Sequence, residues 1–139
     1  MRIGFRNSHW EKEVKVRMVT LDSLIAKYGM PDFIKIDVEG FESDVLDGLS
    51  SMPPALSFEF NTELPKATLA CLGKSVFNKS ALFNYRISTN PNLELPGWVS
   101  AVEISEIVKN GVSTCGTFGD IFAVAEYGCR ASAGRPGNK

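Results

Sequence analysis

The sequence predicts an α/β domain built on a largely parallel sheet. Strand-like and helix-like patterns alternate along the chain, which is typical of domains whose helices connect parallel strands. The length of 139 residues suits one domain, and a hydrophobic content of 44% is enough to form a core. We therefore expect the element order β-α-β-α-β-α-β-α-β.

The first strand is predicted at residues 14–18, where three apolar residues alternate with two basic ones (VKVRM). Gly29 and Pro31 mark the end of the helix that follows, in the order that helix C-termini favour. Thr20 is placed to cap the start of this helix. Its apolar positions recur at helical spacing, namely Leu21, Leu24, Ile25 and Tyr28.

The next two strands are predicted at residues 33–38 and 55–60. After the second of them, Asn61 or Thr62 is expected to cap a helix with Pro65 in its first turn. The buried side of that helix is expected to hold Leu69, Leu72 and Val76. A helix between the two strands is indicated by Phe41, Val45, Leu46 and Leu49.

The last part of the chain contains two further strands and one helix. Residues 81–88 form a predicted strand, and Ser100 and Glu103 have the spacing of a capping box before a helix at about 101–109. Residues 120–127 (DIFAVAEY) are apolar on both faces. We therefore expect this last strand to lie in the middle of the sheet.

Charge and cysteine content exclude several classes of protein. Fifteen Lys and Arg against 16 Asp and Glu leave a net charge of -1, which argues against nucleic-acid binding by bulk electrostatics. No apolar run approaches the ~20 residues that span a bilayer, and the N-terminus does not resemble a signal peptide. Three cysteines without CxxC spacing and one histidine indicate neither a disulfide framework nor a zinc site. We expect a soluble, cytoplasmic domain without a metal.

The most informative stretch is residues 32–40 (DFIKIDVEG), where a buried strand ends in two acidic residues. In open α/β sheets, ligands bind outside the carboxyl ends of the strands. Asp37 and Glu39 are therefore candidates for ligand binding or proton transfer. An equally weighted alternative is structural: Lys35 pairs with Asp37, and Glu39 interacts with the dipole of the following helix.

Glu59 and Asn61 end the next strand, and they are expected beside Asp37 if the two strands are neighbours. A cross-strand hydrogen bond and a helix cap are the favoured structural explanation of this pair. Asp37, Glu39 and Glu59 carry oxygen ligands that suit a hard cation, but nothing in their spacing requires one. No GxGxxG or GxxxxGK[ST] motif occurs, so no phosphate-binding loop is indicated.

Three segments resemble the FkbM family of S-adenosylmethionine-dependent methyltransferases: TLDSL at 20–24, KIDVEGFE at 35–42 and VLDGL at 45–49. Residues 120–124 (DIFAV) resemble the closing strand of that family, so the resemblance covers about 14–127. It implies a class I, Rossmann-like methyltransferase fold, a three-layer sandwich with a mostly parallel sheet. It also implies S-adenosylmethionine as the cofactor. We prefer this interpretation to a nucleotide-binding oxidoreductase, because the dinucleotide fingerprint of that class is missing from this sequence.

The resemblance implies a role for each candidate residue. Asp37 is expected to contact the cofactor with support from Lys35, and Glu39, with Asp37, is the expected catalytic group that orients or deprotonates the acceptor. Glu59 and Asn61 are expected to bind the acceptor. In the implied reaction a hydroxyl oxygen attacks the methyl group and S-adenosylhomocysteine leaves, without a metal. The hydroxyl of a sugar, polyketide, lipid or peptide is left open as the acceptor.

The same resemblance implies that the chain corresponds to the C-terminal part of the family domain, without the Gly-rich cofactor loop. We expect a lead-in at 1–13, the methyltransferase portion at 14–127 and a disordered tail at 128–139. Alone, the chain is expected to be inactive, with an exposed sheet edge suited to a homodimer. The alternatives are a longer working protein, for which Met1 is not the start, and a non-catalytic remnant that binds a partner.

Overall fold

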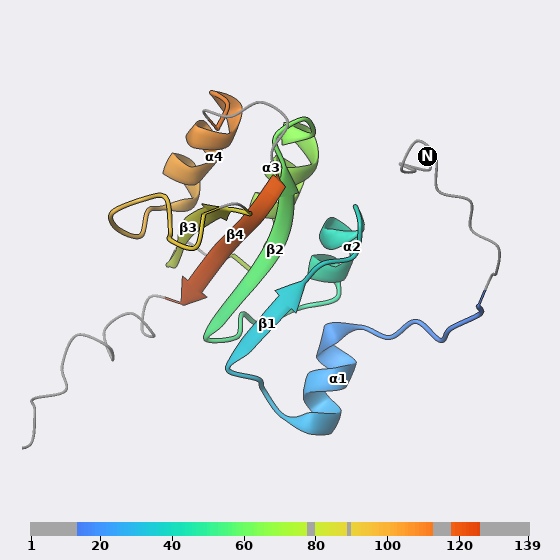
Figure 1. Cartoon of the computed structure of the whole chain (residues 1–139). Helices are drawn as coiled ribbons and strands as arrows, with labels where there is room; N and C mark the ends of the chain where they lie inside the picture. The colour runs from blue at the N-terminus through green and yellow to red at the C-terminus, as the bar shows by residue number, and fades with distance from the viewer. Residues whose placement is uncertain (1–13, 78–79, 89, 113–117, 126–139) are drawn as a thin grey trace, which may run out of the picture.

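The computed structural model describes residues 14–77, 80–88, 90–112 and 118–125, and within them four strands form one mixed sheet (Figure 1). The strands are β1 (Phe33–Ile36), β2 (Ala55–Asn61), β3 (Ala81–Ile87) and β4 (Phe118–Ala125), in the spatial order β1-β2-β4-β3. β1 and β2 are parallel, whereas β4 is antiparallel to both β2 and β3. β1, β2 and β3 therefore share one direction, and β4 alone is reversed.

This topology confirms the α/β class and corrects the predicted strand directions. The prediction of a mostly parallel sheet is wrong, because two of the three neighbouring pairs are antiparallel. The predicted central position of the last strand is confirmed, since β4 pairs on both sides. Because β4 is reversed, it starts at the end of the sheet where the other three strands finish.

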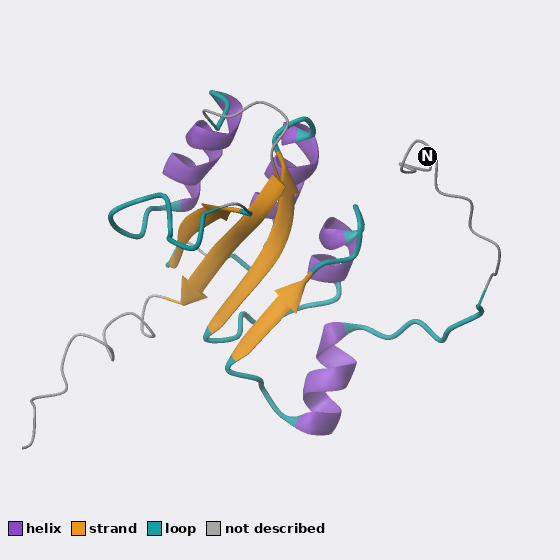
Figure 2. Cartoon of the chain, viewed as in Figure 1, coloured by secondary structure: helices purple, strands orange, loops and turns teal. Residues whose placement is uncertain are grey.

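Three helices cover one face of the sheet: α2 (Glu42–Asp47), α3 (Pro65–Leu72) and α4 (Ala101–Lys109) (Figure 2). Phe58 and Phe83 are fully buried on this face, and the ring of Phe77 lies 6.1 Å and 5.2 Å from theirs. The other face carries Phe33 and Phe122, and neither belongs to this core. The described residues thus form two layers, a sheet and one helix layer, rather than the three layers of the expected sandwich.

Helix α1 (Leu21–Tyr28) begins and ends as predicted. The Thr20 side chain accepts a hydrogen bond from the Ser23 backbone N–H at 3.2 Å, and Gly29 with φ +91° forms the C-cap. The predicted strand at 14–18 is wrong, because these residues have no regular structure and are exposed. A strand needs a hydrogen-bonded partner, and no described strand lies beside this segment.

The two later helices differ in how they begin. α4 has the predicted capping box, in which Ser100 Oγ accepts from the Glu103 N–H at 3.3 Å and the Glu103 carboxylate accepts from the Ser100 N–H at 2.8 Å. α3 has Pro65 in its first turn, but its N-cap is Leu64, without a side-chain hydrogen bond. The predicted cap by Asn61 or Thr62 is therefore wrong, because Asn61 closes the preceding turn by accepting from the Glu63 N–H at 2.8 Å.

Two predicted segments lie outside the described residues: the lead-in at 1–13 and the tail at 128–139. Cys115 and Cys129 lie outside them as well.

Candidate functional site

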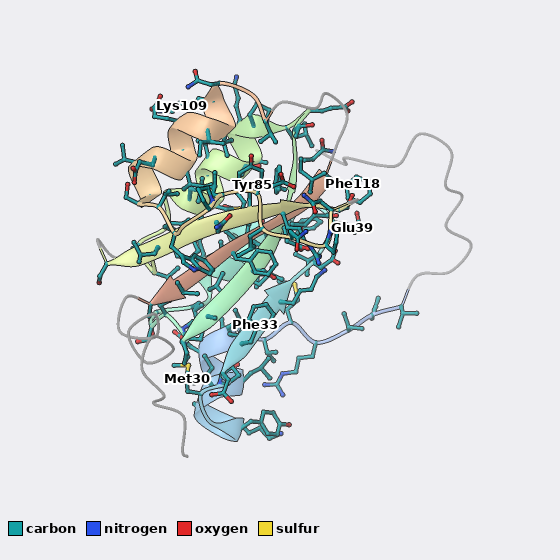
Figure 3. The ribbon with its side chains drawn as sticks, turned by 60° about the vertical axis from the view of Figure 1, so that its left-hand side comes forward. Met30, Phe33, Glu39, Tyr85, Lys109 and Phe118 are labelled. Atoms are coloured by element: carbon teal, nitrogen blue, oxygen red, sulfur yellow. The ribbon has the colours of Figure 1, made fainter. Side chains whose placement is uncertain are left out.

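The carboxyl ends of β1 and β2 and the start of β4 lie together at one end of the sheet, which we call its carboxyl end. Asp37 and Glu39 follow β1, while Glu59 and Asn61 end β2. Because β1 and β2 are direct neighbours, with Lys35 opposite Ser57, the predicted juxtaposition of these side chains is present. Figure 3 shows Glu39 at the same end of the molecule as Phe118, the first residue of β4.

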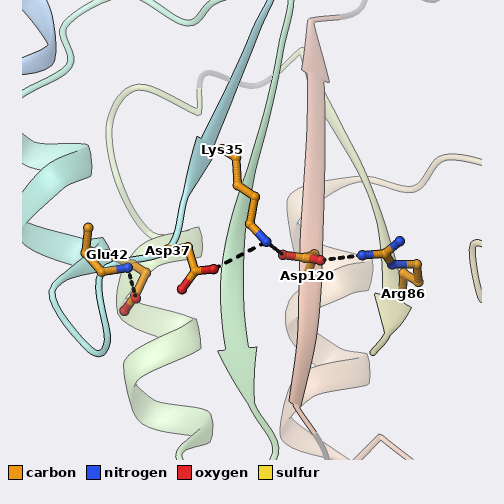
Figure 4. Close-up of polar contacts among 6 residues, drawn as sticks. Lys35, Asp37, Glu42, Arg86 and Asp120 are labelled. Carbon is orange, nitrogen blue, oxygen red and sulfur yellow. Dashed lines mark hydrogen bonds and ion pairs between the residues drawn. The ribbon is translucent and has the colours of Figure 1, made fainter. Parts of the chain in front are cut away.

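A chain of ion pairs crosses from strand to strand at this carboxyl end (Figure 4). Lys35 Nζ lies 3.4 Å from Asp37 Oδ2 and 3.5 Å from Asp120 Oδ1, so its side chain spans β2 to reach β4. Arg86 Nη2 on β3 donates to Asp120 Oδ2 at 2.8 Å. The charge of Asp120, more than that of Asp37, raises the pKa of Lys35. The local Lys35–Asp37 ion pair of the structural alternative is thus confirmed, within a larger network.

The turn between β1 and α2 is held by Glu42. Its Oε1 accepts from the backbone N–H groups of Val38 at 3.2 Å and Gly40 at 3.1 Å, and the residue is 7% exposed (Figure 4). Glu39 has φ +54° and Gly40 has φ +97°, so the chain turns through two left-handed residues. This conformation is costly for a residue with a side chain, and the two bonds to Glu42 stabilise it. The turn ends β1 at Ile36 rather than at Val38.

A cavity of about 420 Å³ lies between the carboxyl end of the sheet and α3. Its polar wall includes Glu39, Glu42, Glu59, Asn61 and Glu63, and its apolar wall includes Phe60, Leu64 and Cys71. The structure therefore brings Glu39, Glu59 and Asn61 to one cavity, and the catalytic and acceptor-binding roles expected of them stay predictions. Asp37 and Lys35 do not line this cavity; they lie beside it in the ion-pair network.

The environment shifts the pKa values of two lining residues. Burial raises the pKa of Glu59, and repulsion from Asp37, Glu39 and other neighbouring carboxylates raises it further. Burial also raises the pKa of the Cys71 thiol to about 11. Cys71 is therefore protonated at neutral pH, whereas the shift at Glu59 favours the protonated form of its carboxyl group.

We expect Glu59→Gln to remove a pH-dependent loss of stability. Because the pKa of Glu59 is raised, the folded state binds this proton more tightly than the unfolded state does. The resulting stabilisation is present below the ordinary pKa of glutamate and is lost as the pH rises through the raised pKa. Urea unfolding across this interval should show a decline for the unchanged protein that the glutamine variant lacks. Glu59→Asp keeps a carboxyl group and should retain the decline, and identical pH profiles for Gln and Glu would contradict the expectation.

Sequence reasoning missed three residues of the site: Glu42, Arg86 and Asp120. Asp120 is 34 residues from Arg86, and only the strand pairing reveals their contact. One signal was available, since Asp120 is an acidic residue at the head of an otherwise apolar strand. Such a residue is buried only with partners, and here it is 7% exposed between two cations.

The described residues offer neither a metal-binding cluster nor a membrane-spanning helix. Within the part of the chain that the structure describes, no three His, Cys, Asp or Glu side chains are placed to hold a metal ion together. None of the described helices has the length and apolar character needed to cross a membrane.

Comparison with protein-family models matches residues 2–68 to the methyltransferase FkbM domain. Over these residues the chain is similar to the FkbM methyltransferase family. Comparisons with curated proteins and with solved structures gave no match. The FkbM segment includes α1, β1, α2 and β2, and therefore Asp37, Glu39, Glu59 and Asn61. Arg86 and Asp120 lie beyond it, so the extension of the FkbM resemblance to residue 127 stays a prediction.

Proposed function

We propose that the chain is part of an S-adenosylmethionine-dependent methyltransferase that methylates a hydroxyl group of a small-molecule acceptor. The observation that carries this proposal is the cavity at the carboxyl ends of β1 and β2, whose lining residues all lie inside the FkbM segment except Cys71. Its volume of about 420 Å³ is in the usual range of small-molecule sites. A methyltransferase family supports a methyl donor, and the cavity supplies a place beside it for a small acceptor.

The acidic residues at the carboxyl ends of β1 and β2 suit S-adenosylmethionine, which carries a sulfonium, an ammonium and ribose hydroxyl groups. Carboxylates accept hydrogen bonds from ammonium and hydroxyl groups and attract the sulfonium. In our proposal Asp37 contacts the cofactor, because its side chain is 45% exposed beside the cavity and Lys35 holds its carboxylate from one side. When bound, the cofactor supplies the methyl group.

In the same proposal Glu39 orients or deprotonates the acceptor hydroxyl, and Glu59 and Asn61 hold the acceptor beside it. Burial and neighbouring carboxylates raise the pKa of Glu59, so a hydrogen bond donated by an acceptor hydroxyl would stabilise its carboxylate form. Alignment of oxygen and methyl group supplies the larger part of the rate enhancement. The four carboxylates that line the cavity disfavour acceptors carrying a phosphate or carboxylate of their own.

Calorimetric titration of the folded chain with S-adenosylmethionine tests the proposal. We expect binding with a dissociation constant of the order of 10 μM, which corresponds to about 7 kcal/mol. Glu39→Gln should leave this binding unchanged, because Glu39 is assigned to the acceptor and not to the cofactor. Glu106→Gln, which removes an exposed ion pair with Lys109 on the remote helix α4, is the matched control and should bind as the unchanged protein does. A folded chain that shows no binding would contradict the proposed function.

A second candidate function is a partner-binding module without catalysis. One observation favours it: β1 pairs with a strand on only one side among the described strands. The same titration separates the two candidates, because a partner-binding module has no requirement for the cofactor.

A further inference from the structure

The wall of the cavity formed by α3 carries a buried hydroxyl group without a partner. Thr68 lines the cavity and is 3% exposed. Its backbone N–H donates to the Leu64 carbonyl at 3.5 Å, but its hydroxyl makes no hydrogen bond with any described residue. Buried polar side chains are nearly always hydrogen-bonded in folded proteins. The Thr68 hydroxyl therefore needs a partner that the described chain does not supply.

This hydroxyl faces the cavity. Among the described residues, Arg86 Nε is the one side-chain nitrogen or oxygen that is completely covered and lacks a hydrogen-bond partner. The Thr68 oxygen therefore keeps some accessible surface, and the space beside Thr68 is the cavity that it lines. Because the described residues enclose Thr68 so closely, its hydroxyl is reached by a group that enters this cavity.

Glu42 is the second enclosed polar side chain of the cavity. It is 7% exposed, and its Oε1 holds the turn by accepting from Val38 and Gly40. No described residue donates a hydrogen bond to its Oε2. Each oxygen of a carboxylate can accept hydrogen bonds. Glu42 therefore has acceptor capacity that the described chain leaves unused.

Glu42 lies beside the part of α3 that carries Thr68. Burial and, after it, the charge of Glu42 raise the pKa of the Cys71 thiol, so these two side chains are near each other. Thr68 lies one helical turn before Cys71 and therefore on the same face of α3. The two unused polar groups, the Thr68 hydroxyl and Glu42 Oε2, thus lie in the same part of the cavity.

The charge of the lining residues indicates which donor fits. None of the described residues that line the cavity is basic, and four are acidic, namely Glu39, Glu42, Glu59 and Glu63. An ammonium group brings three donors and a positive charge, so it pairs with both unused groups and reduces the repulsion among the carboxylates. A neutral hydroxyl group brings one donor and leaves that repulsion in place.

We propose that the acceptor carries an ammonium group besides the hydroxyl that is methylated, and that Thr68 and Glu42 bind this ammonium inside the cavity. An amino alcohol or amino sugar with a primary amine is the chemical class that fits. The apolar wall of Phe60 and Leu64 suits the carbon skeleton between the two polar groups. The identity of this ligand as the acceptor rests on the proposed function, whereas the preference of the cavity for an ammonium does not.

Titration of the full chain with two matched probes, followed by the amide signals in NMR spectra, tests this inference. The probes are trans-4-aminocyclohexanol and the corresponding cyclohexanediol, which differ in having an ammonium or a second hydroxyl at neutral pH. We expect the amine to shift the amide signals around Thr68 and to bind about tenfold more tightly than the diol. Equal binding of the two probes overturns the inference.

Substitutions at Thr68 test its role in binding the amine. Thr68→Val replaces the hydroxyl by a methyl group of similar shape and should weaken amine binding about tenfold, whereas Thr68→Ser keeps the hydroxyl and should retain binding. Ser105→Ala is the matched control, because it removes a helical hydroxyl on α4 that donates to the Ala101 carbonyl away from the cavity lining. Amine binding that Thr68→Val leaves intact overturns the inference.

The stability of Thr68→Val gives an answer that depends on no ligand. An unpaired buried hydroxyl costs stability, and threonine and valine have similar helix propensities. Thr68→Val should therefore unfold at a higher urea concentration than the unchanged protein. A lower unfolding midpoint would show that the hydroxyl has a partner within the folded chain, and it would overturn the inference.

Titration in the presence of S-adenosylmethionine keeps this inference apart from the proposed function. The cofactor carries an ammonium of its own, but Asp37, its proposed contact, does not line the cavity. Saturating cofactor should therefore leave amine binding in place, and displacement of the amine overturns the inference. A chain that binds the amine but not the cofactor contradicts the proposed function and supports the ammonium site. One that binds the cofactor but not the amine contradicts the ammonium site alone.

Discussion

Replacing Gly119 by alanine is expected to destabilise the domain by about 3 kcal/mol or more. Gly119 lies on β4 between β2 and β3, and a Cβ atom there would overlap the backbone oxygen of Arg86. It would also lie 3.0 Å from the ring of Phe60. A backbone oxygen in a strand cannot move without shifting the whole of β3, so the cost falls on the sheet itself. Urea unfolding followed by circular dichroism measures the change in the free energy of unfolding.

Gly97→Ala is the matched control for this substitution. A Cβ atom at Gly97 meets nothing within 4 Å, so the same chemical change should shift the free energy of unfolding only slightly. Equal unfolding midpoints for the two variants would show that β3 and β4 can separate locally at little cost. The close contact at Gly119 would then have no energetic meaning.

We expect Asp37→Asn to weaken binding of S-adenosylmethionine about 10- to 100-fold, which is the usual cost of losing one charge-assisted hydrogen bond. Under the proposed function the carboxylate contacts the cofactor, and the amide keeps its shape but not its charge. Stability should change little, because the ion pair with Lys35 is half exposed on both sides. Calorimetry gives the dissociation constant, and urea unfolding confirms that the fold is retained.

Asp47→Asn provides a stringent control for the loss of one carboxylate charge. Asp47 also pairs with a lysine, Lys74 at 2.6 Å, and it lies at the end of α2, away from the cavity lining. This variant should bind the cofactor as the unchanged protein does. If the two variants bind equally well, Asp37 has no part in the cofactor site, and the role proposed for it must be withdrawn.

The local signals of the sequence predicted local structure well. Thr20 and Ser100 cap their helices as expected, because a cap depends only on residues within one helical turn. The central position of β4 also followed from the sequence, because a strand rich in apolar residues is favoured where it pairs on both sides. The two acidic residues Glu39 and Glu59 were correctly expected at the same end of the sheet, because parallel neighbouring strands end together.

What the sequence could not predict depends on contacts between distant residues. The reversal of β4 leaves no trace in its apolar pattern, so the sheet was expected to be mostly parallel. Residues 14–18 have a strand pattern, but pairing needs a partner that periodicity cannot supply. Asp120 joins Lys35 and Arg86 only because β4 is inserted beside β2 and runs backwards. Asn61 resembles a helix cap but is used in the preceding turn.

The position of β4 has a consequence for how the protein is made. The strand lies between β2 and β3, which do not pair with each other, yet it is the last of the four in the chain. During synthesis β3 therefore emerges without any strand to join, and the sheet closes only after residues 118–125 have left the ribosome. Until then Lys35 and Arg86 lack the carboxylate that lies between them. We therefore expect the sheet of this domain to be completed late in folding, because its last pairings join residues far apart in the sequence.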